Sequence, residues 1–220
     1  MRWHRNLGDA YLYSKQSEDA LRQYDLALRL APRDIFLLHK KGLALLECGN
    51  DMGAAKVLEQ VLDIDPNSGT WSTEIAGLKG RLFWQKYQRD GALSDLEVAL
   101  DAYVQGLNSN LNSHYMADNV GQLRLLLGDP NGARQAFQAG LAALDKTGDR
   151  GYWALATKAS CYLGLGERTA GLEALEQVLP LGPEPAAIES IKRGLRRLHQ
   201  GLRGDEEELE TWLRTLDAAN

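Results

Sequence analysis

The side chains that most often carry catalysis are few in this chain, and their spacing fits no metal-binding or catalytic motif. The two cysteines, Cys48 and Cys161, lie far apart without the CxxC spacing of zinc and redox sites. We expect them to be reduced thiols that pack as small hydrophobic residues. No HExxH sequence occurs, and the histidines are scattered: His4, His39, His114 and His199. The sequence therefore predicts no metal ion and no cofactor.

Glycines and carboxylates give no stronger sign of chemistry. The segment YLGLGERTAG holds Gly164 and Gly166, but the spacing is not GxGxxG and no phosphate-loop lysine follows. It is typical of a turn between two helices. Many carboxylates lie close in sequence to lysines or arginines, as on any solvated helix face, and none is singled out as an acid or a base. We therefore predict that the chain is not an enzyme.

One segment near the C-terminus is basic. Five cations occur within twelve residues: Lys192, Arg193, Arg196, Arg197 and Arg203. An acidic run from Asp205 to Glu210 follows directly. Two interpretations remain open, namely two adjacent helices that neutralise each other, or a site for an anionic partner.

The bulk composition bounds the class of protein. Of 220 residues, 44% are hydrophobic and 25% are charged, which is too apolar for a disordered chain. The net charge of −5 disfavours a nucleic-acid partner that is bound through a general positive field. No apolar run approaches a membrane span, and the N-terminus lacks the apolar core of a secretory signal. We expect a cytoplasmic protein without a membrane partner.

Internal repetition is the main signal of the sequence. At an offset of 34 residues, the first segment matches the second in three places: Gly8 on Gly42, Ala20 on Ala54 and Pro32 on Pro66. The first segment carries the whole set of Leu7, Gly8, Tyr11, Ala20, Tyr24, Ala27 and Pro32. This set resembles the tetratricopeptide repeat, a helical hairpin. Gly8 and Ala20 are then expected where the two helices cross, since larger side chains would push the helix axes apart.

Later repeats keep the same columns with looser spacing. Gly121, Ala133, Phe137 and Gly140 mark the fourth, and Ala159, Tyr162, Gly171, Leu175, Val178 and Pro183 mark the fifth. In the third, nineteen residues separate Gly80 from Ala99, where the first repeat has twelve between Gly8 and Ala20. We therefore predict an unusually long first helix in the third repeat, at about residues 71 to 89.

These columns predict an all-α fold, a right-handed α-solenoid of about five tetratricopeptide-like hairpins in a single domain over 1–220. The expected hairpins are about 1–34, 35–68, 69–111, 112–147 and 150–183. Two amphipathic helices, 184–202 and 205–218, are expected to cap the C-terminal end, because the last repeat would otherwise expose an apolar face. The chain begins inside a repeat helix with no cap in front of it, which suggests a piece of a longer protein.

Residues 77–128 carry a narrower resemblance. Gly80-Arg81, Tyr103, Gly106, Tyr115 and Asn119 are spaced as in the TRAF-binding helical-repeat region of apoptosis signal-regulating MAP kinase kinase kinases and its bacterial relatives. That resemblance implies a scaffold or sensor role in signalling, since in the kinases the region is a regulatory docking module and in bacteria similar repeats accompany signalling or conflict effectors as sensors. No kinase domain accompanies it here.

A binding surface can be predicted from the same columns, because in tetratricopeptide arrays the first helix of each hairpin lines a concave groove. The strongest candidates are Arg5, Asp9, His39, Lys40, Arg81, Trp84, Tyr115, Asp118, Asn119, Gln122 and Trp153. Further positions on that face are Tyr13, Phe36, Gln85, Thr157 and Ser160. The carboxylate clamp of chaperone-binding relatives is not expected, since Glu74 and Leu78 replace two of its basic residues.

Two functions follow from this surface. The favoured hypothesis is a scaffold or adaptor that binds a peptide or helix of a protein partner in the groove. The alternative is a sensor that holds a small anionic signal molecule around Arg81 and Asn119 and regulates an effector.

Overall fold

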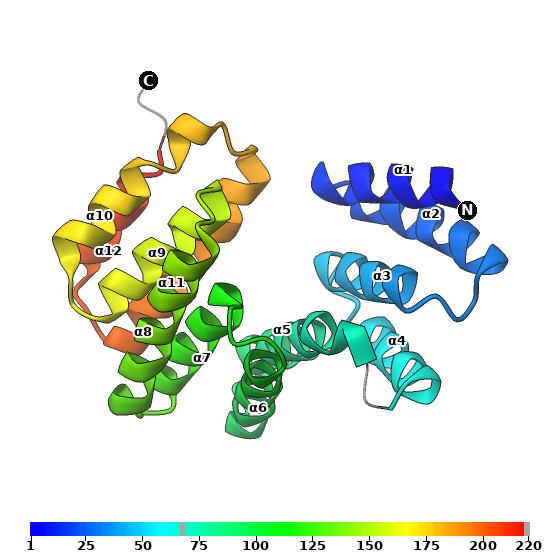
Figure 1. The fold of residues 1–220 in the computed structure, drawn as a ribbon, viewed down its shortest axis with the longest axis horizontal. Helices are drawn as coiled ribbons and strands as arrows, with labels where there is room; N and C mark the ends of the chain where they lie inside the picture. Colours follow the sequence, from blue (N-terminus) through cyan, green and yellow to red (C-terminus); the bar gives the residue numbers. More distant parts are fainter. Residues whose placement is uncertain (67–68, 218–220) are drawn as a thin grey trace. The chain divides into compact units, whose positions relative to one another are not determined.

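The computed structural model describes residues 1–66 and 69–217, and every regular element in these ranges is helical (Figure 1). This confirms the all-α prediction. The expected ends of the second hairpin at 68 and of the last helix at 218 lie outside the described residues. Contacts divide the chain into two compact units, Met1–Ser109 and Asn110–Asn220, which we treat separately as unit 1 and unit 2.

Unit 1 consists of three helical hairpins. Its helices are α1 (Arg2–Tyr13), α2 (Ser17–Leu30), α3 (Ile35–Glu47), α4 (Asp51–Ile64), the 3₁₀ turn η1 (Gly69–Trp71), α5 (Ser72–Asp90) and α6 (Leu93–Ser109). Each hairpin packs on the next, and the first helices α1, α3 and α5 also contact one another in that order.

Unit 2 consists of two hairpins and a C-terminal helix pair. Its helices are α7 (His114–Leu126), α8 (Pro130–Thr147), α9 (Tyr152–Gly164), α10 (Arg168–Glu176), the 3₁₀ turn η2 (Leu179–Leu181), α11 (Pro185–Leu202) and α12 (Glu206–Arg214). The first helices α7 and α9 lie side by side.

Side-chain caps fix where several first helices begin. The Asp34 carboxylate accepts a hydrogen bond from the Leu37 amide (3.1 Å), and the Ser113 hydroxyl accepts one from Met116 (3.3 Å). Both satisfy amides that have no partner inside the helix. The caps therefore set the register of α3 and α7, and with it the face that each helix presents.

Glycines lie at the helix crossings, as the columns predict. A Cβ atom on Gly8 would lie 2.7 Å from the Tyr24 ring, and one on Gly80 would lie 2.7 Å from the Tyr103 ring. Ala20 is completely buried. The close approach of the paired helices therefore depends on the small residues that the repeat pattern selects.

The third hairpin has the expected long first helix. Helix α5 has 19 residues, whereas α1 has 12 and α3 has 13. It ends at Gly91, whose φ of 69° is a left-handed conformation that glycine adopts without strain.

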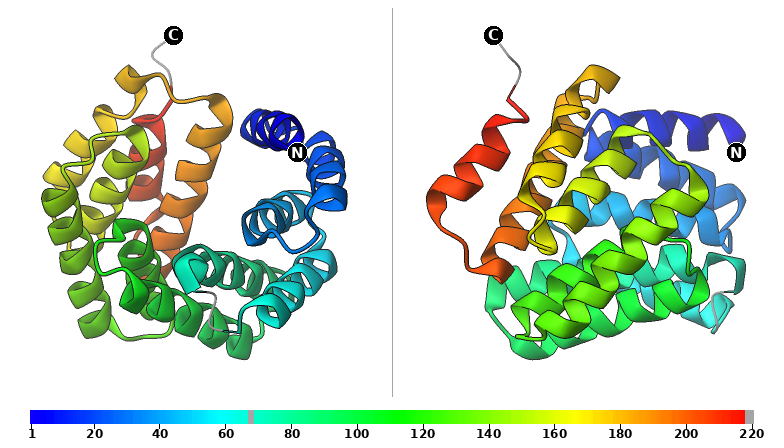
Figure 2. Two further views of the ribbon diagram at one scale, coloured as in Figure 1. Left: turned by 45° about the vertical axis from the view of Figure 1, so that its right-hand side comes forward. Right: turned by 60° about the vertical axis from the view of Figure 1, so that its left-hand side comes forward.

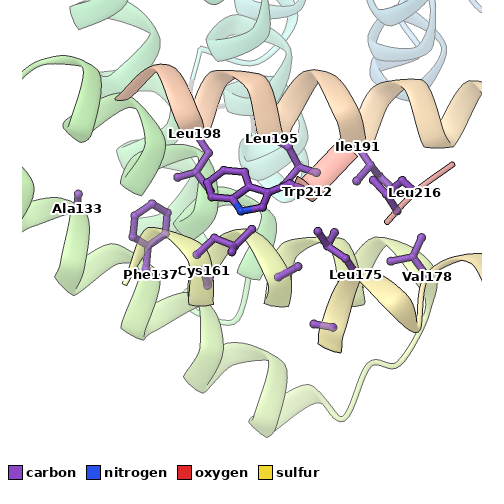
Figure 3. Packing of buried hydrophobic residues seen from close by; sticks show 13 residues of the cluster. Ala133, Phe137, Cys161, Leu175, Val178, Ile191, Leu195, Leu198, Trp212 and Leu216 are labelled. Atoms are coloured by element: carbon purple, nitrogen blue, oxygen red, sulfur yellow. The ribbon is translucent and has the colours of Figure 1, made fainter. Parts of the chain in front are cut away.

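The core of unit 2 includes the C-terminal helix pair. Ile191, Leu195 and Leu198 of α11 pack with Trp212 of α12 against side chains of α8, α9 and α10 (Figure 3). Trp212 is 1% exposed. The two terminal helices are thus part of the hydrophobic core of this unit.

Helix α11 lies against the first helices of unit 2. It contacts α7 and α9, and its orange ribbon runs beside both in the two views of Figure 2. Gly201 fits closely against Leu125 of α7, where a Cβ atom would lie 2.8 Å from the leucine side chain. The face of α7 and α9 on which a partner was expected is therefore in contact with the chain's own helix.

Candidate functional site

The first helices share columns that can be counted from the crossing residue. That residue is Gly8 in α1, Gly42 in α3, Gly80 in α5, Gly121 in α7 and Ala159 in α9. The positions two before and one after it carry five of the eleven strongest predicted binding residues, namely Asp9, Lys40, Arg81, Asn119 and Gln122. We use these two columns to compare the two units.

In unit 1, α1 and α3 are joined by a partly exposed chain of charged and aromatic side chains. The Arg5 guanidinium lies 4.7 Å from the centroid of the Phe36 ring, and Lys40 Nζ lies 5.4 Å from the same ring. Lys40 Nζ is also 3.9 Å from an Asp9 carboxylate oxygen, which accepts a hydrogen bond from the Tyr24 hydroxyl (2.8 Å). Two cations, Arg5 and Lys40, thus lie close to one aromatic ring that is partly exposed.

A second cluster joins α3 to α5. The Glu47 carboxylate pairs with Lys15 (2.9 Å) and with Arg81. Burial opposes ionisation of Glu47, but the charges and hydrogen bonds of Arg81 and Lys15 outweigh it and lower the pKa of Glu47 to about 2. The carboxylate is therefore charged at neutral pH and holds both cations on this face.

We call these side chains the first-helix face of unit 1. Its members are Arg5, Asp9, Lys15, Phe36, Lys40, Glu47 and Arg81. Arg5 and Lys15 are exposed, and the others are partly exposed. Within the described part of unit 1, the main contacts of α1, α3 and α5 are with their hairpin and stacking neighbours and with η1, so no further helix of unit 1 packs on this face.

Two candidates in unit 1 are buried and not part of this surface. His39 is 9% exposed, and burial together with the charge of Lys40 lowers the pKa of its ring to about 4, so it is neutral at neutral pH. Trp84 is 8% exposed and packs against the Tyr87 ring, with centroids 5.5 Å apart. The expectation that both face a partner is wrong for this structure, because both side chains are buried.

In unit 2, the predicted polar residues of α7 are buried in contact with α11. The Arg197 guanidinium donates to Asn119 Oδ1 (2.7 Å) and to Gln122 Oε1 (2.5 Å). Gln122 Nε2 in turn donates to Asp118 and to Ser160 of α9. Asn119 is 3% exposed and Gln122 is 1% exposed. These residues form one hydrogen-bonded network that joins α7, α9 and α11.

Asp118 is the buried acid of this network. Its carboxylate accepts hydrogen bonds from the Ser160 hydroxyl (2.5 Å) and from Gln122 (2.9 Å). Burial raises the pKa of Asp118, although these two hydrogen bonds and the charge of Arg197 partly oppose the rise. Glu47 and Asp118 thus have pKa values shifted in opposite directions.

The network corrects the prediction for Asp118, Asn119 and Gln122. All three lie on the face of α7 that the columns select, but their hydrogen-bonding groups are used within the chain. Arg197, the residue that uses them, was assigned in the sequence only to a basic run. Its position beside the apolar stripe of α11 could have suggested partial burial, but no pattern in one sequence pairs it with α7.

Two aromatic candidates of unit 2 are exposed. Tyr115 is 46% exposed on α7, and Trp153 is 48% exposed on α9, where its ring lies 5.3 Å from the Tyr152 ring. A small-anion site around Arg81 and Asn119 gains no support, because Arg81 is paired with Glu47 and Asn119 accepts from Arg197.

The basic run of α11 forms ion pairs at Lys192, which pairs with Asp217 and, at 4.0 Å, with Glu189. In the following helix, Arg214 pairs with Glu210 (2.6 Å). Both interpretations of the basic run, mutual neutralisation of two helices and a site for an anionic partner, stay predictions.

A hollow of about 630 Å³ lies elsewhere in unit 2, beside the C-terminal end of α8. Leu144, Leu155 and Pro180 form its apolar wall, with Arg150 and Lys158 among the polar residues that line it. Its lining comes from the C-terminal end of α8, from α9, from Gln177 after α10 and from the 3₁₀ turn η2. None of the predicted site residues lines it.

The described residues form neither a metal-ion cluster nor a membrane-spanning helix. In the ranges that the structure describes, no three His, Cys, Asp or Glu side chains are grouped to hold a metal ion. No helix in those ranges is both long and apolar enough to cross a membrane.

Comparison with known proteins agrees with the repeat pattern. Residues 2–34 match the family model of the tetratricopeptide repeat. The whole fold is similar to a tetratricopeptide protein of Thermus thermophilus, with TM-score 0.65 and 19% identity over 90% of this chain and 98% of that one. No protein curated for function matches the sequence. The narrower resemblance of residues 77–128 is not shown.

Two further structures share the fold. PilF of Pseudomonas aeruginosa is similar with TM-score 0.60 and 14% identity over 100% of this chain and 92% of that one. A chain of the APC/C hetero-tetramer Cut9–Hcn1 is similar with TM-score 0.63 and 15% identity, over 97% of this chain and 42% of that one. At these identities the comparisons establish the class of fold, a tetratricopeptide-type helical repeat.

Proposed function

We propose that the chain is a non-enzymatic interaction module, a scaffold or adaptor, that binds a segment of a protein partner on the first-helix face of unit 1. The observation that carries this proposal is the chain of Arg5, Phe36, Lys40 and Asp9, which stays exposed or partly exposed between two first helices. Phe36 also packs against the core of unit 1 and the Trp71 ring, whereas Arg5, Lys40 and Asp9 are polar residues at the surface. Arginine beside an aromatic ring is a common composition of binding hot spots.

The contrast with unit 2 supports this location. There the equivalent face is covered by α11, and its hydrogen-bonding groups are already paired. A partner that bound there would first have to remove Ile191, Leu195 and Leu198 from the core. That step would expose apolar surface at a cost of several kcal/mol. The first-helix face of unit 1 requires no such step.

The fold comparisons add a weaker argument. Cut9–Hcn1 is by its name a complex of two proteins, and one of its chains shares this fold. Helical-repeat surfaces of this kind commonly bind protein partners along their stacked helices.

The test is a selection of binding peptides from a random phage-displayed library, followed by fluorescence anisotropy with the selected peptides. We expect the double variant Arg5→Ala/Lys40→Ala to weaken the tightest peptide by tenfold or more. The matched control is Arg134→Ala/Lys146→Ala, which removes two exposed cations from α8. The free energy of unfolding of both variants should lie within about 0.5 kcal/mol of that of the parent, since the residues are at least partly exposed.

Two results would contradict the proposed function. One is a selection that returns no peptide with measurable affinity. The other is a set of peptides whose affinities do not distinguish the Arg5/Lys40 variant from the α8 control.

A further inference from the structure

One side of each first helix in unit 1 can be followed through the stack by two positions, five residues before and two residues after the crossing glycine. In α3 these positions hold Leu37 and Ala44, both completely buried in one hydrophobic cluster with side chains of α2. In α5 they hold Ile75 and Leu82, which are 5% and 2% exposed in a cluster with side chains of α4. We call this side the stacking face, because it packs on the preceding hairpin.

Helix α1 has the same two positions, and both are exposed. Trp3 lies five residues before Gly8 and is 67% exposed, and Ala10, two residues after Gly8, is also exposed. Asn6 and Tyr13 lie on the same side of α1, since these four residues follow one another at three or four positions. Both are exposed as well. The main contacts of α1 within the described part of unit 1, with α2 and α3, therefore leave its stacking face open to solvent.

The stacking face of α1 has the composition of a protein interface. Two of its four residues are aromatic and none is charged, whereas the exposed side of a helix usually carries charged side chains. The charged residues of this helix lie elsewhere: Arg2 flanks the face, and Arg5 and Asp9 belong to the first-helix face of unit 1. Tryptophan is enriched among the residues that contribute most to binding energy.

The Trp3 ring has a defined contact within its own hairpin. It packs edge-to-face against the His4 ring, with centroids 5.0 Å apart and an angle of 77° between the planes. His4 Nδ1 in turn lies within hydrogen-bond distance of Gln23 Oε1 on α2 (2.8 Å). A side chain that is already positioned loses less conformational entropy when a partner covers it. Trp3 is therefore suited to anchor an interface.

A second copy of the chain offers a complementary surface at its own α1. The faces of α2 and α4 that cover α3 and α5 are already occupied in each copy. Two α1 helices that pack antiparallel about a two-fold axis beside Asn6 would place Trp3 of each copy over Ala10 of the other, because a two-fold interface repeats every contact reciprocally. A large ring then lies against a small residue, as the Tyr24 ring lies against Gly8 inside the hairpin.

From these observations we infer that the chain self-associates through α1, with the stacking face of one copy packed antiparallel on the stacking face of a second copy and Trp3 opposite Ala10. The contact lies on a different side of α1 from Arg5 and Asp9. It therefore goes beyond the proposed function and leaves the first-helix face of unit 1 available to a protein partner.

The first experiment is sedimentation velocity on the full chain from about 1 to about 300 μM, a range that covers the weak affinities of small interfaces. We expect a monomer–dimer equilibrium in the parent, and Trp3→Ala should raise the dimer dissociation constant about tenfold or more. The matched control is Trp153→Ala, which removes another exposed tryptophan and should leave the constant unchanged within about twofold. Circular dichroism melts confirm that each variant is folded.

The second experiment tests the geometry by disulfide cross-linking in a Cys48→Ser background, which lacks the exposed native cysteine and keeps the buried Cys161. Asn6→Cys places a thiol beside the expected two-fold axis, and Arg5→Cys places one on the first-helix face of the same helix. Under mild oxidation, Asn6→Cys should form the covalent dimer about tenfold faster than Arg5→Cys.

Several results would overturn the inference. The chain could remain monomeric over the whole range, or Trp3→Ala could leave the dimer as strong as Trp153→Ala does. Equal cross-linking rates for Asn6→Cys and Arg5→Cys would show that the copies meet through another surface. If the chain is monomeric and Trp3→Ala instead weakens a peptide selected from the phage library, the stacking face binds a different protein. None of these results bears on the Arg5/Lys40 variant, whose peptide affinities test the proposed function separately.

Discussion

The first helices of the two units carry equivalent columns and put them to opposite use. In unit 1 the acid Glu47 is held between two cations on a partly exposed face, and burial is outweighed by its partners. In unit 2 the acid Asp118 is buried and hydrogen-bonded to neutral groups, so the effect of burial on its pKa dominates. The network around Asp118 also includes Arg197 of α11, whereas no helix of unit 1 packs on the first-helix face of that unit.

The position of a residue in the repeat determines the direction in which its side chain points. It does not determine whether that side chain is exposed. Lys40 and Asn119 occupy the same column, two residues before a crossing glycine. Lys40 is partly exposed, whereas Asn119 is buried in contact with Arg197. A residue on the binding face of a repeat becomes a binding residue only where no other part of the chain occupies that face.

The largest test of the comparison concerns the apolar contact of α11. Leu195 is 2% exposed in the core of unit 2, so Leu195→Ala should lower the free energy of unfolding by about 2–5 kcal/mol. Chemical denaturation measures this change. Arg196→Ala, one residue along and exposed, is the control and should change it by less than about 0.5 kcal/mol. A loss below about 1 kcal/mol for Leu195→Ala would mean that α11 is only loosely attached.

The next test concerns the polar contact of the same helix. Arg197→Ala leaves Asn119 Oδ1 and Gln122 Oε1 buried without this donor, so we expect a loss of about 2 kcal/mol. Asn119→Ala should also destabilise the chain, and a double-mutant cycle should show that the two changes are not additive. Additive effects would show that the two side chains do not act together.

A smaller effect is expected at Glu47 in unit 1. Glu47→Gln removes the charge that pairs with Lys15 and Arg81, and a loss of about 1–2 kcal/mol is expected at neutral pH for a partly exposed pair. The folded-state pKa of about 2 lies below the ordinary 4.5, so the native carboxylate contributes stability above about pH 4.5 and loses it as the pH falls toward 2. Melting curves between pH 2 and pH 7 should therefore converge for parent and variant at the acidic end.

The smallest effect, with the opposite sign, is expected at Asp118 in unit 2. Since the folded-state pKa is raised above 3.8, the stability linked to this group is present at low pH and decreases as the pH rises through the folded value. Asp118→Asn keeps the shape and removes the buried charge, so it should raise stability at neutral pH by about 1 kcal/mol. The difference from the parent should vanish below about pH 3. If Asp118→Asn instead destabilised the chain at pH 7, the favourable interaction of the carboxylate with Arg197 would outweigh the cost of burying its charge, contrary to the raised pKa.

Much of the fold follows from local pattern in the sequence. Gly8, Gly80 and Gly121 stand where two helices cross, since only a residue without a Cβ atom fits beside Tyr24, Tyr103 and Phe137. The long helix α5 is likewise readable, because its apolar residues repeat at helical spacing over the added segment. These features depend on contacts between residues of one hairpin. Such residues lie close together in the sequence, so the local pattern predicts them.

The candidate site was predictable only in part, because exposure depends on distant residues. The columns predicted that Arg5, Asp9 and Lys40 share one face. In the structure, Arg5 and Lys40 lie over the Phe36 ring, and Asp9 lies beside Lys40. They equally selected Asn119 and Gln122, which α11 covers from more than seventy positions along the chain. The sequence by itself determined which helices form and where they cross. It also determined which side of each first helix faces away from the second helix of its hairpin. Only the tertiary structure decided which of those sides stays exposed. The sequence of an amphipathic helix shows that its apolar stripe must be buried, but it does not show which surface the stripe packs against.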